Sequence, residues 1–168
     1  MVVVDSSKIP YPKELPLNFS YYHKPDLTFA DKVLFGLTMI KSDVVAMSAD
    51  DDFLINSSLM SAAEMMFNDN SISLSFGSFI AFDESTNNNF SYLPMLNFQK
   101  KYFLSNKSKQ KKIRHFMKNY DQVLWSMYRK DVIETAFNLI KKSKFKNDNF
   151  IEVCIASIAI TIGKLNIL

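Results

Sequence analysis

The chain has 168 residues, a length typical of one domain, and 48% of them are hydrophobic, which is enough for a sizeable core. A formal net charge of +3 is too small to indicate nucleic-acid binding, and a single cysteine, Cys154, excludes an internal disulfide framework. The N-terminus has no basic region followed by a long apolar stretch, so no secretory signal peptide is predicted and a cytoplasmic protein is expected.

The first elements expected along the chain are two strands and a helix. Met1–Val4 is a continuous apolar run followed by Asp5, which predicts a buried parallel strand that ends in a polar loop. Asn18–Tyr22 is a candidate short strand. Thr28, with Asp31 three residues later, predicts the capped start of an amphipathic helix.

The rest of the chain continues to alternate between strand and helix patterns. Val44–Ser48 predicts a second buried strand, and Ile72–Phe76, where serines alternate with apolar residues, predicts a half-buried one. Further elements are expected as a helix from residue 57 or 58 to 67, a polar loop over 83–99, a basic helix over 107–118, a short strand or turn over 124–128 and a helix over 130–142. A final apolar helix is expected to be capped by Asp148 or Asn149 and to end at Gly163, which is well placed as its C′ residue.

Strands that alternate with helices predict an α/β fold. In open α/β sheets, ligands bind beyond the carboxyl ends of the strands. Asp5 and Asp50–Asp52 both follow predicted strands at this end. We therefore expect these two acidic loops to meet in one crevice.

Asp50, Asp51 and Asp52 are the residues with the clearest chemical potential. Adjacent carboxylates repel one another by about 1 kcal/mol per close pair in water, so three together indicate a cation. Oxygen ligands suit Mg²⁺ or Mn²⁺, and these ions commonly bring a phosphate with them. Because the three glycines are isolated, a phosphate would need the metal and side chains rather than a glycine-rich loop. The alternative interpretation is an acidic turn before a helix.

Several segments, taken in order, resemble family 2 glycosyltransferases of the GT-A fold, and in particular a bacterial subgroup known as the glycosyltransferase domain. The segments that carry the resemblance are Val2-Val3-Val4-Asp5-Ser6-Ser7, Asp31-Lys32-Val33, Val44–Phe53, Leu124–Val132, Phe150–Val153 and Gly163-Lys164.

The resemblance implies a GT-A-like mixed sheet flanked by helices, in a single domain over residues 1–168. Residues 1–82 would form the nucleotide- and metal-binding half and residues 83–168 the acceptor-side half. Family members usually begin with an earlier strand, and Met1 opens on what resembles their second strand. The resemblance therefore implies an N-terminally truncated member of the family.

The resemblance also implies roles for particular residues. Asp5 matches the aspartate that contacts the nucleotide base. Asp50 matches the aspartate near the ribose, and Asp52 matches the ligand of Mg²⁺ or Mn²⁺. Asp51, between Asp50 and Asp52, is counted with the nucleotide-binding residues. The substrates would be a nucleotide-sugar donor and a glycan, lipid or protein acceptor. An inverting enzyme also needs a carboxylate base, for which Glu152 is the candidate.

Structural alternatives stay open for these residues. Asp5 can be a turn residue, because aspartates are common where a strand ends. Glu152 can complement the dipole at the start of its helix. The basic stretch Lys100–Lys118 is either a solvated helix face or a contact for an anionic acceptor or a membrane surface. Nucleic acid is not a predicted partner, since no nucleic-acid-binding motif accompanies the charge.

Two other functions remain as alternatives to a glycosyltransferase. One is a different Mg²⁺-dependent enzyme that handles phosphate. The other is a truncated remnant without catalytic activity, or an interaction module.

Overall fold

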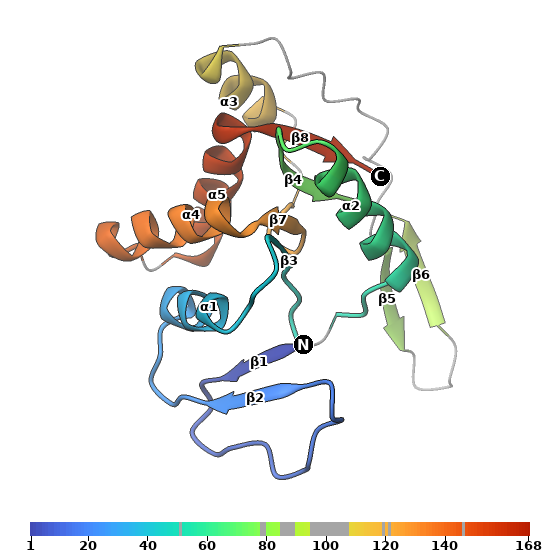
Figure 1. Ribbon diagram of the computed structural model, residues 1–168, viewed down its shortest axis with the longest axis vertical. Coiled ribbons are helices and arrows are strands. Elements are labelled where there is room, and N and C mark those ends of the chain that lie inside the picture. The colour runs from blue at the N-terminus through green and yellow to red at the C-terminus, as the bar shows by residue number, and fades with distance from the viewer. Residues whose placement is uncertain are drawn as a thin grey trace.

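The computed structural model describes residues 1–50, 52–77, 80–84, 90–94, 108–118, 120, 122–145 and 147–168. Within these ranges the chain alternates between strands and helices (Figure 1), which confirms a mixed α/β fold. The elements in chain order are β1 (Val2–Asp5), β2 (Ser20–His23), α1 (Phe29–Thr38), β3 (Val44–Ala46), α2 (Asn56–Asn68), β4 (Ile72–Phe76), β5 (Ile80–Glu84), β6 (Phe90–Pro94), α3 (Lys109–Lys118), β7 (Met127–Arg129), α4 (Lys130–Ser143), α5 (Asp148–Ile162) and β8 (Lys164–Ile167).

The central sheet has four strands in the order β3-β7-β4-β8. Strand β7 is antiparallel to both of its neighbours, β3 and β4, whereas β8 runs parallel to β4. The sheet is therefore mixed. It draws β3 and β4 from the first half of the chain and β7 and β8 from the second, so the two halves share one core.

Helices cover both faces of this sheet. On one face, Leu74 and Tyr128 belong to a large core cluster that includes Phe137 of α4 and Ile155 of α5. On the other face, Val44 and Met127 pack with Ala62 and Met66 of α2. Figure 1 shows the same layers, with α2 on one side of the sheet and α4 and α5 on the other.

Strand β4 differs from the sequence prediction. Alternating serines predicted a half-buried strand, but all five of its residues are buried, with Ser73 and Ser75 only 2% and 1% exposed. The reason is that β4 lies inside a sheet covered by helices on both faces. Hydrogen bonds compensate the buried hydroxyls: Ser73 Oγ donates to the Ala159 carbonyl at 2.7 Å, and Ser75 Oγ accepts from Asn166 Nδ2 at 3.0 Å.

Strands β1 and β2 form a separate parallel pair, in which Val2 pairs with Ser20 and Asp5 with His23. The prediction of a parallel strand at the N-terminus is confirmed, but the strand is half-buried rather than buried. A two-stranded sheet cannot enclose its residues as the central sheet does. Helix α1 packs against this pair, since a Cβ added to Gly36 would lie 3.4 Å from Val4 Cγ2.

Helix α1 begins as its sequence predicts. Thr28 Oγ1 accepts a hydrogen bond from the Asp31 backbone amide at 3.2 Å, which satisfies one of the free N–H groups of the first turn. Asp31 also forms an ion pair with Lys141 of α4 at 2.7 Å. The helix thus connects the two-stranded sheet to the helical layer of the central core.

Three other expectations need correction. The predicted polar loop over 83–99 contains part of an antiparallel hairpin, β5 and β6, although residues 85–89 and 95–99 lie outside the described part of the chain. Helix α5 is capped by Asn147, whose Oδ1 accepts from the Phe150 amide, rather than by Asp148 or Asn149. Strand β8, which follows Gly163 directly, was not predicted from the sequence.

Gly163 was expected as the C′ residue that ends α5, a position where glycine is often left-handed. Its φ of −143° is instead extended, a conformation that any residue adopts. The requirement for glycine is one of space, because an added Cβ would lie 2.6 Å from the Ser71 carbonyl oxygen. No helix in the described part of the chain is long and apolar enough to cross a membrane.

Candidate functional site

Asp50 and Asp52 lie on an exposed segment that leaves the central sheet. Val44 and Val45 of β3 are buried, and the Met47 amide continues the pairing by donating to the Ser126 carbonyl at 3.1 Å. The chain then leaves the sheet, and both carboxylates are exposed, without an ion-pair partner among the described residues. Asp51 lies outside the described residues. The core therefore anchors the segment while its carboxylate oxygens stay available to a ligand.

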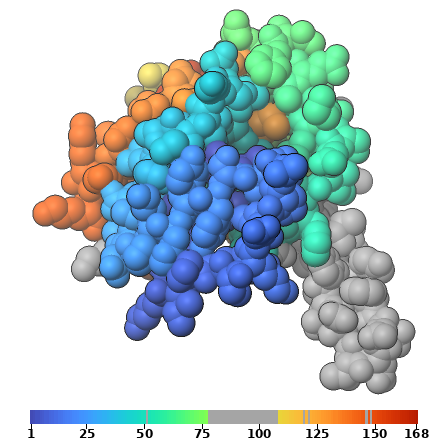
Figure 2. Space-filling view, turned by 60° about the horizontal axis from the view of Figure 1, so that its bottom comes forward, coloured from blue at the N-terminus to red at the C-terminus, as the bar shows by residue number. Residues whose placement is uncertain are grey.

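Asp5 sits at the carboxyl end of β1 in a compact hydrogen-bond network. Its Oδ2 accepts from the Tyr21 hydroxyl of the neighbouring strand, and its Oδ1 accepts from the Ser7 amide at 2.8 Å. The Tyr21 oxygen in turn accepts from the Tyr11 amide at 2.8 Å. The Asp5 carboxylate thereby ties β1, β2 and the loop between them together. This N-terminal segment forms one face of the molecule (Figure 2).

The network keeps Asp5 ionised. The hydrogen bond from the Tyr21 hydroxyl, followed by those from Ser7, lowers the pKa of Asp5 well below its usual value of 3.8. His23, which is paired with Asp5 across the strands, donates from Nε2 to the Ser7 carbonyl at 2.8 Å, since a carbonyl can only accept. The contact with the Ser7 amide is also that of an aspartate turn, so this geometry favours the turn interpretation raised from the sequence.

Glu152 lies inside the helical layer. It is 9% exposed, and its Oε1 accepts a hydrogen bond from the Tyr120 hydroxyl. Tyr128 of β7 lies nearby. Its burial raises the pKa of its phenol, and the negative charge of Glu152 raises that pKa further. The Tyr128 hydroxyl donates to the Val123 carbonyl at 2.5 Å. Glu152 thus belongs to a polar cluster with the buried Tyr128 and the exposed Tyr120.

The predicted site residues come from separate parts of the fold. Asp5 ends a strand of the two-stranded sheet, Asp50 and Asp52 follow a strand of the four-stranded sheet, and Glu152 lies in the first half of α5. Within the described ranges, no group of three or more His, Cys, Asp and Glu side chains is placed to hold a metal ion. A metal at Asp50 and Asp52 would therefore depend on a ligand such as a phosphate for its remaining coordination.

Sequence reasoning missed two side chains that shape these sites, Tyr21 and Tyr120. Tyr21 is 16 residues from Asp5, and only the parallel register of β1 and β2 brings them together. Tyr120 is 32 residues from Glu152, and no sequence motif links the two.

Comparisons of the chain with protein-family models, with curated proteins and with solved structures found no match. The resemblance to family 2 glycosyltransferases stays a prediction.

Proposed function

We propose that this chain is a GT-A-type glycosyltransferase domain that moves a sugar from a nucleotide-sugar donor to the hydroxyl of a glycan, lipid or protein acceptor. The observation that carries the proposal is the position of Asp50 and Asp52. Both carboxylates are exposed on a segment anchored by the buried strand β3, and neither is neutralised by a described cationic side chain.

The donor atoms at this segment suit Mg²⁺ or Mn²⁺. Mg²⁺ is usually held by one or two carboxylates together with substrate phosphates, so two aspartates are enough protein ligands for it. Asp52 would hold the metal and Asp50 would lie toward the ribose. Bound there, the metal would stabilise the negative charge that develops on the leaving nucleoside diphosphate.

Asp5 supports nucleotide binding in this proposal by a second route. Its carboxylate is held ionised by Tyr21 and Ser7, which makes it a fixed acceptor for the N–H groups of a base. Both oxygens of Asp5 already accept hydrogen bonds, so a nucleotide base would donate to oxygens that also accept from Tyr21 and Ser7.

Glu152 is the proposed base, and its burial sets a condition on that role. A base must reach the acceptor hydroxyl directly or through one water. With 9% exposure and a hydrogen bond from Tyr120, Glu152 would need Tyr120 to move aside. Its alternative role is to hold the Tyr120–Tyr128 cluster together.

Product formation tests the proposal. The protein would be incubated with Mn²⁺ and UDP-, GDP- or TDP-sugars, and the release of nucleoside diphosphate by transfer or hydrolysis would be followed. We expect release with at least one donor and its loss in Asp52→Asn. Glu152→Gln should lower turnover if Glu152 is the base, whereas retained turnover assigns it to the structural cluster. Donor binding without any release would instead favour a remnant without activity.

A further inference from the structure

A second candidate site lies at the opposite end of the central sheet from Asp50 and Asp52. Strand β7 is antiparallel to β3, and Arg129 pairs with Val44, the first residue of β3. A cavity of about 250 Å³ opens at this end, between the starts of β4, β8 and α4 and the side of α3. The aspartates follow the other end of β3. This cavity is therefore separate from the site proposed above.

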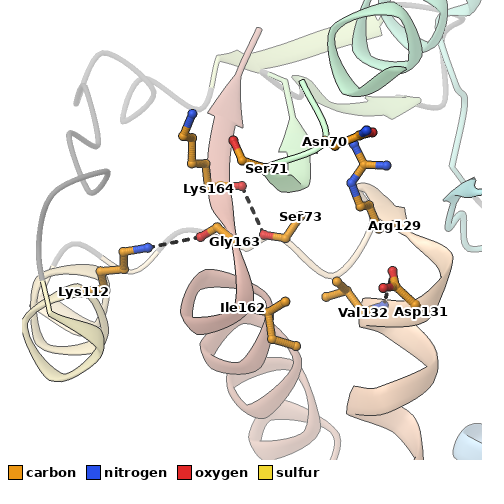
Figure 3. Close-up of a pocket in the computed structure, with 10 residues that line it drawn as sticks. All are labelled: Asn70, Ser71, Ser73, Lys112, Arg129, Asp131, Val132, Ile162, Gly163 and Lys164. Atoms are coloured by element: carbon orange, nitrogen blue, oxygen red, sulfur yellow. Dashed lines mark hydrogen bonds between the residues drawn. The ribbon is translucent and has the colours of Figure 1, made fainter. Parts of the chain in front are cut away.

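The walls of the cavity carry more positive than negative charge. Figure 3 shows the charged residues that line it: Lys112 on α3, whose ammonium points to the Gly163 carbonyl, Lys164 at the start of β8, and Arg129 and Asp131 at the junction of β7 and α4. Among the described residues, three cations and one carboxylate therefore line the cavity. Asp69, which does not line it, forms an ion pair with Lys164 at 3.1 Å and offsets that charge in part.

Only one nitrogen of the Arg129 guanidinium, Nη2, donates hydrogen bonds to described residues. Its Nη2 donates to the carbonyls of Met66 and Asp69, at 2.5 Å and 3.0 Å, where α2 ends. Its Nε is buried and has no hydrogen-bond partner among the described residues. A buried donor without a partner costs about 1–3 kcal/mol, and more for a charged group. The guanidinium is thus fixed by α2 while another of its donors remains unused.

No described carboxylate neutralises Arg129 or Lys112. Asp131 lines the same cavity, but its Oδ1 accepts from the Val132 amide at 2.9 Å in the first turn of α4, and no ion pair joins it to either cation. The ammonium of Lys112 contacts the neutral Gly163 carbonyl at 3.3 Å. Two cations at one cavity therefore have only neutral partners in the described part of the chain.

We propose that this cavity binds a small oxyanion, namely a free phosphate or the phosphoryl group of a small phosphorylated molecule. Arg129 supplies a fixed positive charge, and Lys112 and Lys164 supply additional positive charge. A guanidinium suits this role because its planar set of N–H groups matches the geometry of phosphate oxygens. Asp131 opposes binding by repulsion and limits the affinity.

Calorimetric titration with inorganic phosphate tests the proposal. The buffer would contain EDTA, so that a metal at Asp50 and Asp52 cannot contribute, and chloride would keep the ionic strength constant. NMR should show shifts of the Ser71 and Lys164 amides on addition of phosphate. A parallel titration with glycerol 3-phosphate would separate a free anion from an ester: tighter binding of the ester identifies a phosphorylated molecule as the ligand, and equal binding identifies free phosphate.

Two variants should change the affinity in opposite directions. Lys112→Met should weaken phosphate binding by about three- to tenfold, the effect of one unit charge at a partly exposed site. Asp131→Asn should strengthen it by a similar factor, because asparagine keeps the oxygen that accepts from the Val132 amide but loses the charge.

Matched controls make the test specific to the cavity. Lys109→Met on α3 and Glu134→Gln on α4 remove the same charges from exposed residues that do not line it, and each should change the affinity by less than about twofold. The proposal is overturned if phosphate does not bind, if Asp131→Asn does not bind more tightly, or if the controls change the affinity as much as the cavity variants.

Discussion

Gly163→Ala tests the tight contact between the end of α5 and the start of β4. An added Cβ would lie 2.6 Å from the Ser71 carbonyl oxygen, 2.7 Å from Ser73 Cβ and 2.9 Å from Ser73 Oγ. These distances are shorter than van der Waals contact, so the neighbours would have to move. The Ser71 carbonyl also accepts from the Lys164 amide at 2.7 Å, so its movement would weaken the first hydrogen bond between β4 and β8.

The size of the effect follows from the rigidity of these neighbours. Overpacking a closely packed interior costs about 1–3 kcal/mol. For a domain of this length, each kcal/mol lowers the melting temperature by about 3 °C, so a decrease of roughly 3 to 9 °C is expected. Backbone strain adds nothing, since the φ of −143° at Gly163 suits any residue.

The other two glycines provide controls in the same assay, thermal unfolding followed by circular dichroism. Among the described residues, a Cβ at Gly77 would meet only the Leu168 side chain, at 3.6 Å, so Gly77→Ala should leave the melting temperature almost unchanged. Gly36 lies inside α1, where alanine is favoured over glycine by about 1 kcal/mol, so Gly36→Ala should not destabilise the protein. A Gly163→Ala variant that melts with the wild type would refute the argument from close contact.

Two further substitutions test the Asp5 network and the core. The pKa of Asp5 is lowered on folding, so this carboxylate contributes stability above its unfolded value of 3.8, and that contribution is lost as the pH falls below it. Tyr21→Phe removes the largest cause of the shift and should raise the pKa of Asp5 toward 3.8 in an NMR titration of its carboxyl carbon; an unchanged pKa would show that Tyr21 does not hold the charge. Phe137 of α4 is fully buried in the core, so Phe137→Ala should lower the free energy of unfolding by about 3–5 kcal/mol in urea denaturation. The control is Met60→Ala, at a side chain that is 70% exposed, which should change the free energy of unfolding by less than about 0.5 kcal/mol. Similar losses for the two variants would contradict the core assignment.

Local sequence signals predicted the local parts of the fold. Thr28 and Asp31 mark the start of α1 because the cap involves only neighbouring residues. The apolar run at Val44 and Val45 indicates a buried strand for the same reason. Such patterns need no information about the rest of the molecule, which is why they could be read from the sequence.

Burial that depends on distant segments could not be predicted in this way. The alternation around Ser73 indicates a strand with one exposed face, but α5, more than 70 residues later, covers that face and accepts the serine hydrogen bond. Gly163 suggested a helix cap, yet the space that it leaves is occupied by β4. In both cases the explanation lies in tertiary packing.

The candidate site was predictable only where it depends on local sequence patterns. The sequence places Asp50 and Asp52 after a buried strand, and the structure agrees. The sequence also predicted one crevice shared with Asp5; β1 and β3 belong to different sheets in the described structure, and the shared crevice stays a prediction. Arg129 lies in a segment that carries the family resemblance, but no role was predicted for its side chain, whose partners lie at the end of α2, about 60 residues earlier.

The binding of a nucleoside diphosphate with Mn²⁺ tests the central claim most directly. A ligand that binds only the folded state stabilises it, by about 2.7 kcal/mol at one hundred times its dissociation constant. We therefore expect Mn²⁺ with UDP, GDP or TDP to raise the melting temperature of the wild type and of Glu64→Gln, an exposed acid on α2, but not of Asp52→Asn. The absence of a rise with all three nucleotides, or an equal rise in Asp52→Asn, would contradict a metal-dependent donor site at Asp50 and Asp52.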